Sequence, residues 1–148
     1  MDQQILRIRH DVHGAKVEKT INGFNITYDD SGNGENQQFN PGTSALTFKG
    51  RESLDNLIKV FHDFPDTWLR IESFTDNNGP DGLNMALSQR RAYAVANYLK
   101  QKKISPHRLM VRWYGETRAK VKNVSAVARA ENRRIEIVVT SSSEKRQH

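Results

Sequence analysis

Residues 48–74, FKGRESLDNLIKVFHDFPDTWLRIESF, decide the fold because they combine a helix period with a strand period. The first part predicts a helix from Phe48 to Asp63, since its apolar residues recur at the i, i+3, i+4 and i+7 spacing of an amphipathic helix. Those residues are Leu54, Leu57, Ile58 and Phe61. From Trp68 to Phe74, apolar and polar side chains alternate, which predicts a strand with one buried face.

The same alternation of helix and strand continues towards the C-terminal end. Helical spacing of apolar residues predicts a second helix from about Asn84 to Lys102. Strands are predicted at Arg108–Tyr114 and Arg134–Thr140, with a short helix near Ser125–Arg129 between them. Strands that alternate with helices and end in a strand pair indicate an α/β sandwich, with helices on one face of a mixed sheet.

The first 38 residues predict a hairpin followed by a loop. Val17–Ile21 and Phe24–Tyr28 are rich in β-branched and aromatic residues, and the Asn22-Gly23 pair between them is a strong hairpin signal. Residues 1–15 show no clean period and are interpreted as a leader or an added edge segment. Residues 29–38 are polar and predict a surface loop.

The composition fits one soluble domain with a basic second half. The 148 residues carry a net charge of +6, and residues 51–148 hold 18 basic and 11 acidic side chains, against 5 and 6 in residues 1–50. Such a surface attracts polyanions, whether nucleic acid, acidic lipid or carboxylate-rich peptides. The chain has no Cys, which excludes disulfides, thiolate metal sites and Cys nucleophiles. No apolar run is long enough to span a bilayer.

Three segments of the second half match the motifs of one protein family. Residues 75–79, TDNNG, fit a T-D-x-x-G loop, and residues 84–92, NMALSQRRA, fit N-x-x-L-S-x-x-R-A. Residues 123–125, NVS, followed by residues 129–137, RAENRRIEI, fit N-x-T/S and then R-A-x-N-R-R-V/I-E-I. In this order and spacing the chain resembles the OmpA C-terminal family of peptidoglycan-binding domains, which includes the Pal lipoproteins and the periplasmic part of the MotB flagellar stator. Ser73-Phe74 departs from the Gly-His or Gly-Tyr that the family usually has there.

The resemblance implies an α+β fold, an α/β sandwich with a βαβαββ core and an N-terminal hairpin. Its mixed sheet has the order 1-4-2-3, with strand 4 antiparallel and two long helices on one face. Residues 39–140 are expected to form the peptidoglycan-binding domain, with Phe39–Leu46 as a weaker match to its first core strand and loop. Residues 1–38 are expected to form an extension that packs on this domain or leads into it, and residues 141–148 a polar tail.

The resemblance also implies a ligand and the residues that bind it. Peptidoglycan stems of the diaminopimelate type present an ammonium and a carboxylate on one side-chain carbon, so a complementary site needs one anion and one cation. The resemblance assigns these roles to Asp76 and Arg91, and a planar guanidinium can hold a carboxylate bidentately. Asn84, two helical turns before Arg91, is expected on the same helix face, where it caps the helix or fixes the loop. Thr75, Asn40 and Arg133 complete the candidate peptidoglycan-binding residues.

Each candidate also has a structural alternative. Asp76 could brace a turn, and Arg91 could pair with Asp76 inside the protein. Asn132 and Arg133 could join the last strand to the neighbouring loops. Arg90 and Arg134 are interpreted as solvated or paired surface charges.

We expect a binding module of the cell envelope and not an enzyme, because no catalytic set, cofactor motif or metal-ligand cluster is recognisable. The alternatives are a basic nucleic-acid-binding domain, suggested by the charge and Trp113-Tyr114, and a wall-modifying enzyme. A stator or secretion-system module with weakened wall binding is a further alternative. The chain has no recognisable signal peptide, so we expect a periplasmic fragment of a larger membrane-anchored or outer-membrane protein, with homodimerisation left open.

Overall fold

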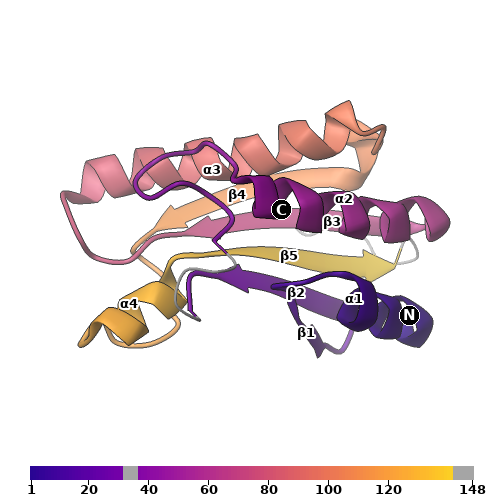
Figure 1. Cartoon of the computed structure of the whole chain (residues 1–148), viewed down its shortest axis with the longest axis horizontal. Coiled ribbons are helices and arrows are strands. Elements are labelled where there is room, and N and C mark those ends of the chain that lie inside the picture. Colours follow the sequence, from indigo (N-terminus) through magenta and orange to yellow (C-terminus); the bar gives the residue numbers. More distant parts are fainter. Residues whose placement is uncertain (32–36, 142–148) are drawn as a thin grey trace.

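Five strands form one mixed sheet in this computed structural model, which describes residues 1–31 and 37–141 (Figure 1). In spatial order they are β1 (Lys16–Lys19), β2 (Gly23–Asp29), β5 (Arg134–Ser141), β3 (Thr67–Phe74) and β4 (Leu109–Gly115). Neighbouring strands are antiparallel except for β3 and β4, which are parallel. Counted from β2, this arrangement confirms the predicted order 1-4-2-3 with an antiparallel fourth strand.

The first strand of this core is β2, and not the segment around Phe39–Leu46 to which the resemblance assigned it. Phe39 and Leu46 form only an isolated bridge. Pro41 and Gly42 lie between them, and both residue types weaken a strand. β2 instead pairs with β5 along its whole length, from Gly23 to Asp29. The hairpin predicted as part of an extension therefore supplies a strand that is integral to the sheet.

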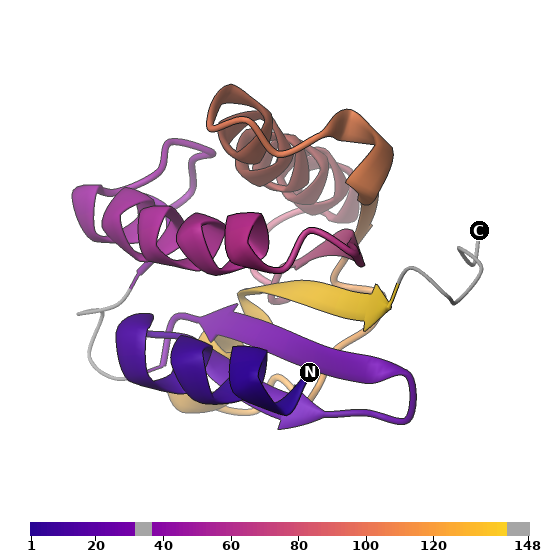
Figure 2. The ribbon, with the colours of Figure 1, turned by 90° about the vertical axis from the view of Figure 1, so that its right-hand side faces the viewer.

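Three helices lie on one face of the sheet, α1 (Asp2–Asp11), α2 (Phe48–Asp63) and α3 (Asp81–Gln101) (Figures 1 and 2). The bounds of α2 are those predicted, and α3 begins three residues before its predicted start. Thr47 caps α2, because its Oγ1 accepts a hydrogen bond from the N–H of Gly50 at 2.9 Å. The helices and the inner sheet face bury one continuous core, whose members include Ile8, Leu54, Leu57, Phe61, Ile71, Leu99 and Ile137.

The helix α1 is a correction to the sequence analysis, which expected a leader or an edge segment. α1 buries Ile5 and Ile8 and packs against α2. Arg7 Nη1 also donates to Asp63 Oδ2 at 2.6 Å, which ties the two helices together. Two buried apolar residues in ten are too few to give a visible period. The helix therefore depends on tertiary packing and not on its own pattern.

The predicted hairpin is confirmed, with Thr20 N–H donating to Gly23 O at 2.9 Å. Glycine is needed at position 23 for a reason that the turn signal did not contain. A Cβ on Gly23 would lie 1.9 Å from the carbonyl oxygen of Val139 on β5. The close approach of two strands, and not the turn conformation, excludes a side chain here.

The remaining elements connect the sheet to the loops at one end. The predicted short helix is confirmed as α4 (Ala126–Asn132), which follows Ser125 and leads directly into β5, and a 3-10 turn, η1 (Pro106–Arg108), precedes β4. Residues 32–36 of the predicted polar loop and 142–148 of the predicted tail lie outside the described residues. Within the two described ranges, no helix combines the length and the apolar character that crossing a membrane requires.

Candidate functional site

The loop that follows β3 presents a buried carboxylate. Thr75 N–H donates to Gly115 O at 2.8 Å, which fixes the start of the loop to the end of β4. Asp76 is 5% exposed, and its Oδ1 accepts the N–H of Asn78 at 2.9 Å. This contact is an Asx turn, so the proposed turn-bracing role of Asp76 is real. It uses one carboxylate oxygen and leaves Oδ2 for another partner.

Asn84 fixes this loop and does not cap the helix. The N-cap residue of α3 is Pro80, which makes no side-chain cap. Asn84 Nδ2 donates to the carbonyl oxygen of Asn78 at 2.8 Å, with longer contacts of 3.4 Å to Asp76 O and 3.5 Å to Gly79 O. Of the two roles predicted for Asn84, the structure therefore confirms the second.

Arg91 supplies a desolvated guanidinium two turns further along α3. The residue is 6% exposed, its Nε donates to Thr43 O at 2.7 Å, and its guanidinium carbon lies 4.8 Å from the centre of the Phe39 ring. Within the described ranges, no carboxylate lies within 4.0 Å of Arg91. Burial lowers the pKa of Arg91, although arginine remains protonated in proteins. Among the described residues, the partners of this cation are therefore a carbonyl oxygen and an aromatic ring.

Arg133, and not Arg91, forms the ion pair with Asp76. Arg133 Nη1 lies 2.5 Å from Asp76 Oδ2, and its Nε lies 2.9 Å from Asp30 Oδ2. Burial opposes the charged form of this guanidinium, but the hydrogen bonds to Asp76 and Asp30 outweigh it and raise the pKa of Arg133. One arginine thus bridges two carboxylates that lie far apart in the sequence.

Asp30 is a site residue that was not predicted from the sequence, because residues 29–38 were assigned to a surface loop. Asp29 in fact ends β2 and is buried, and Asp30 follows it and lies against Arg133. Burial raises the pKa of the Asp30 carboxyl, although its hydrogen bond with Arg133 acts in the opposite direction. The available signal was a pair of acids that directly follows an alternating strand, where a loop side chain can turn back towards the sheet edge.

These residues line a cavity of about 290 Å³. It brings together five of the six predicted residues, namely Thr75, Asp76, Asn84, Arg91 and Arg133. The other lining residues are Asp30, Gln37, Pro41, Gly42, Asn78 and Leu87. Asn40, the sixth, is exposed and does not line the cavity, and its carbonyl oxygen accepts hydrogen bonds from Thr43. The cavity therefore combines two acids and two arginines with apolar surface.

The residues next to Arg133 have structural roles. Asn132 is fully buried, and its side chain makes four hydrogen bonds with the segment from Lys120 to Asn123. This confirms the structural alternative for Asn132. Arg134, which was interpreted as a solvated or paired surface charge, is buried and paired. Its guanidinium carbon lies 3.7 Å from the centre of the Phe74 ring, and its Nε lies 2.6 Å from Glu136 Oε2. The Phe at position 74 thus gives this arginine a ring to stack on.

The aromatic pair that suggested nucleic-acid binding packs within the protein. Trp113 contacts Tyr93, with ring centres 5.7 Å apart, and Tyr114 stacks on Phe74 at 5.1 Å. Tyr114 also lies 4.1 Å beneath the guanidinium of Arg118. These rings already have partners on their own protein, so they do not form a row of free rings on which successive bases could stack.

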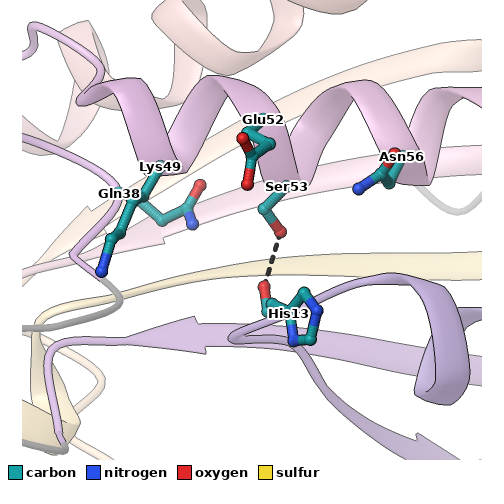
Figure 3. A pocket seen from close by; sticks show the side chains of 6 residues that line it. All are labelled: His13, Gln38, Lys49, Glu52, Ser53 and Asn56. Atoms are coloured by element: carbon teal, nitrogen blue, oxygen red, sulfur yellow. Dashed lines mark hydrogen bonds between the residues drawn. The ribbon is translucent and has the colours of Figure 1, made fainter.

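A second cavity, of about 250 Å³, lies between α2 and the turn before β1 (Figure 3). Ser53 lines this cavity, and its hydroxyl donates to His13 O at 2.7 Å and lies within hydrogen-bond distance, 3.0 Å, of the Tyr28 hydroxyl. Lys49 and Glu52 on its rim are exposed charges on α2. No group of three or more potential metal ligands occurs here or elsewhere in the described part of the chain. This cavity lacks the buried, oppositely charged pair found in the first.

Comparison with known proteins identifies the family of this chain. The model of the OmpA family matches residues 38–133. The probable lipoprotein YiaD of Escherichia coli is 30% identical over 95% of this chain and 63% of its own length. The peptidoglycan-binding protein ArfA of Mycobacterium tuberculosis is 37% identical over 60% of this chain and 27% of its own length. The chain therefore spans less than two thirds of these relatives.

The fold also occurs among solved structures. A putative MotB-like protein from Desulfovibrio vulgaris superimposes with a TM-score of 0.80 at 23% identity, covering 95% of this chain and 93% of that structure. At this identity the likeness establishes the fold alone. It agrees with the mixed sheet and the helices on one face described above.

Proposed function

This chain belongs to the OmpA family, and we propose that it binds peptidoglycan without a covalent bond and thereby anchors a larger envelope protein to the cell wall. The related ArfA protein is named as peptidoglycan-binding. The observation that carries the proposal is that one cavity holds both a buried carboxylate, Asp76, and a buried guanidinium, Arg91, that forms no ion pair with the described residues. Such a site is incomplete until a ligand brings the missing anion.

Diaminopimelate is the part of the stem peptide that fits these charges best. Its side chain ends in a carbon that bears an ammonium and a carboxylate, which would pair with Asp76 and Arg91, respectively. Arg91 Nε is already fixed by Thr43, so the two terminal nitrogens of its planar fork are the groups left to hold a carboxylate. Leu87 and Pro41 offer apolar contact to the methylene groups between the charged end and the peptide.

The burial of Asp76 and Arg91 explains why the cavity would bind one ligand selectively, whereas exposed charges only attract acidic polymers in general. Exposed charges are screened by salt, whereas a buried pair is screened much less. The +6 charge would therefore draw the domain to an acidic wall, and the cavity would hold the stem once there. We also propose a periplasmic location and a membrane-anchored parent, because the relatives include a probable lipoprotein and a peptidoglycan-binding protein. Homodimerisation stays a prediction, which light scattering of the purified chain can test.

The test is calorimetric titration with two stem peptides, one with diaminopimelate and one with lysine, which lacks the carboxylate assigned to Arg91. Wild type should prefer the diaminopimelate peptide by at least about tenfold, because a charge-assisted hydrogen bond contributes about 1.5 to 3 kcal/mol. Arg91→Ala should remove most of this preference. Asp76→Asn should weaken the binding of both peptides, since both carry the ammonium.

Arg90→Ala is the matched control, because Arg90 has the same charge on the same helix but is exposed. It should lower the retention on insoluble peptidoglycan only slightly and leave the preference between peptides unchanged. Equal affinity of wild type for the two peptides would refute the role of Arg91. No binding of either peptide or of intact wall would refute the proposed function itself.

A further inference from the structure

A second carboxylate enters the cavity from outside the segment that the family model matches. The match begins at residue 38, whereas Asp30 directly follows β2. The Asp30 side chain is 18% exposed and accepts Arg133 Nε at 2.9 Å. Its backbone N–H donates to Ala130 O at 3.1 Å, which fixes the end of β2 to α4. Asp30 is therefore built into the cavity and is not a freely solvated acid.

Arg133 occupies the carboxylate that the ammonium of the ligand would need. Its Nη1 lies 2.5 Å from Asp76 Oδ2, while Asp76 Oδ1 is bonded to the N–H of Asn78. Both oxygens of a residue that is 5% exposed are thus engaged. An incoming ammonium can contact Asp76 only by taking over, or sharing, the position of this guanidinium nitrogen.

We propose that Asp30 is a positioning residue that retains Arg133 when Asp76 passes to the ligand, an inference that rests on the proposed function. In the bound state Arg133 pairs with Asp30, the ammonium with Asp76, and the carboxylate with Arg91. Each charge then has a counter-charge. Without Asp30, Arg133 would leave Asp76 only by becoming an unpaired, partly buried cation, which is costly. The guanidinium would then compete with the ligand.

Calorimetric titration of the whole chain with a diaminopimelate stem peptide tests this exchange. Asp30→Asn should weaken binding by about tenfold, because Arg133 then has no carboxylate left when Asp76 is released, so its guanidinium stays on Asp76 and competes with the ligand. Asp30→Glu, which keeps the carboxylate, should recover most of the affinity. Glu131→Gln removes the same charge two residues from Arg133 in sequence but outside the cavity, and should bind as wild type does. An Asp30→Asn variant that binds like wild type would overturn the inference and leave the proposed function intact.

A double-mutant cycle separates an effect through Arg133 from direct contact with the ligand. In an Arg133→Gln background, Asp30→Asn should change the affinity little, because no guanidinium remains to be retained. The same tenfold loss in that background would mean that Asp30 touches the ligand, which contradicts the inference. Complete loss of binding in Arg133→Gln alone would also contradict the inference. In the proposed bound state the ligand contacts Asp76 and Arg91, and Arg133 contacts only Asp30.

A measurement on the wild type needs no variant to fold. The Nε–H resonance of Arg133 reports its hydrogen bond to Asp30. On saturation with the stem peptide this resonance should keep its hydrogen-bonded shift, while the Nη resonances change as Asp76 is released. Loss of the Nε–H hydrogen bond on binding would show that Arg133 abandons Asp30, and would refute the proposed exchange.

Discussion

Replacing Asn84 by Ala should weaken ligand binding but change the free energy of unfolding little. The reason is that the Asn84 side chain fixes the loop of Asp76 and contributes little to the rest of the fold. Its strongest contact is the 2.8 Å hydrogen bond from Nδ2 to Asn78 O, and the contacts to Asp76 O and Gly79 O are 3.4 and 3.5 Å long. Asn84 also lies in the first turns of α3, where Ala is a better helix former. The variant therefore removes a tie to the loop and improves the helix.

The two effects on stability nearly cancel. Loss of one good hydrogen bond costs about 0.5 to 1.5 kcal/mol, and the long contacts add little. Helix propensity returns up to about 0.7 kcal/mol. The free energy of unfolding should therefore fall by less than about 1 kcal/mol. The loss of binding free energy is not compensated in this way. In the variant the loop of Asp76 is more mobile, so it must be ordered when the ligand binds. One residue fixed costs about 1 to 2 kcal/mol, which corresponds to about five- to thirtyfold weaker binding.

The assay is titration of the diaminopimelate stem peptide into each variant, with urea unfolding of the same samples. Gln89→Ala is the control, since it removes an exposed amide from the same helix. Asn84→Asp should bind at least as weakly as Asn84→Ala, because a carboxylate would face the three carbonyl oxygens that the amide now contacts. Unchanged binding in Asn84→Ala would refute the argument that Asn84 keeps the loop in its binding geometry.

Two further predictions concern stability. Asn132→Ala should lower the free energy of unfolding by about 2 to 4 kcal/mol, because it removes four hydrogen bonds from a fully buried side chain. Urea denaturation measures this change, and a loss below about 1 kcal/mol would contradict the prediction. Because burial raises the pKa of Asp30 above its ordinary 3.8, the stability that its protonated form contributes should be lost as pH rises through the raised value. The unfolding free energy of wild type minus that of Asp30→Asn should accordingly decrease as pH rises above about 4, and an increase would disprove the assigned direction.

The parts of the molecule that could be predicted from the sequence are those specified locally. The stripe of α2 identifies its residues, because a helix buried on one face repeats its apolar positions every three or four residues. Asp76, Asn84 and Arg91 belong to one strand–loop–helix unit, so a short motif specifies all three. This unit alone is enough to place these three residues in the same cavity.

The parts that could not be predicted depend on contacts between distant segments. α1 has only a few buried apolar residues, and its helix is stabilised by the surface of α2. Arg133 is 57 residues from Asp76 and 103 residues from Asp30 in sequence. No period or spacing in the chain relates these three positions. The sequence therefore suggested Arg91, the nearer arginine in the chain, as a possible internal partner of Asp76, whereas the structure pairs Asp76 with Arg133.

The register of the sheet explains why Arg133 reaches both acids. β5 lies between β2 and β3 and is antiparallel to each, and Arg134 is opposite Asp29 on one side and Phe74 on the other. One step beyond these pairs, the chain places Arg133 between Asp30 and the loop that starts at Thr75. A slip of one residue in either pairing would turn the Arg133 side chain to the other face of the sheet and break both ion pairs. The charge arrangement of the cavity is thus a consequence of strand pairing, with the hairpin strand β2 as necessary to it as the motif loop.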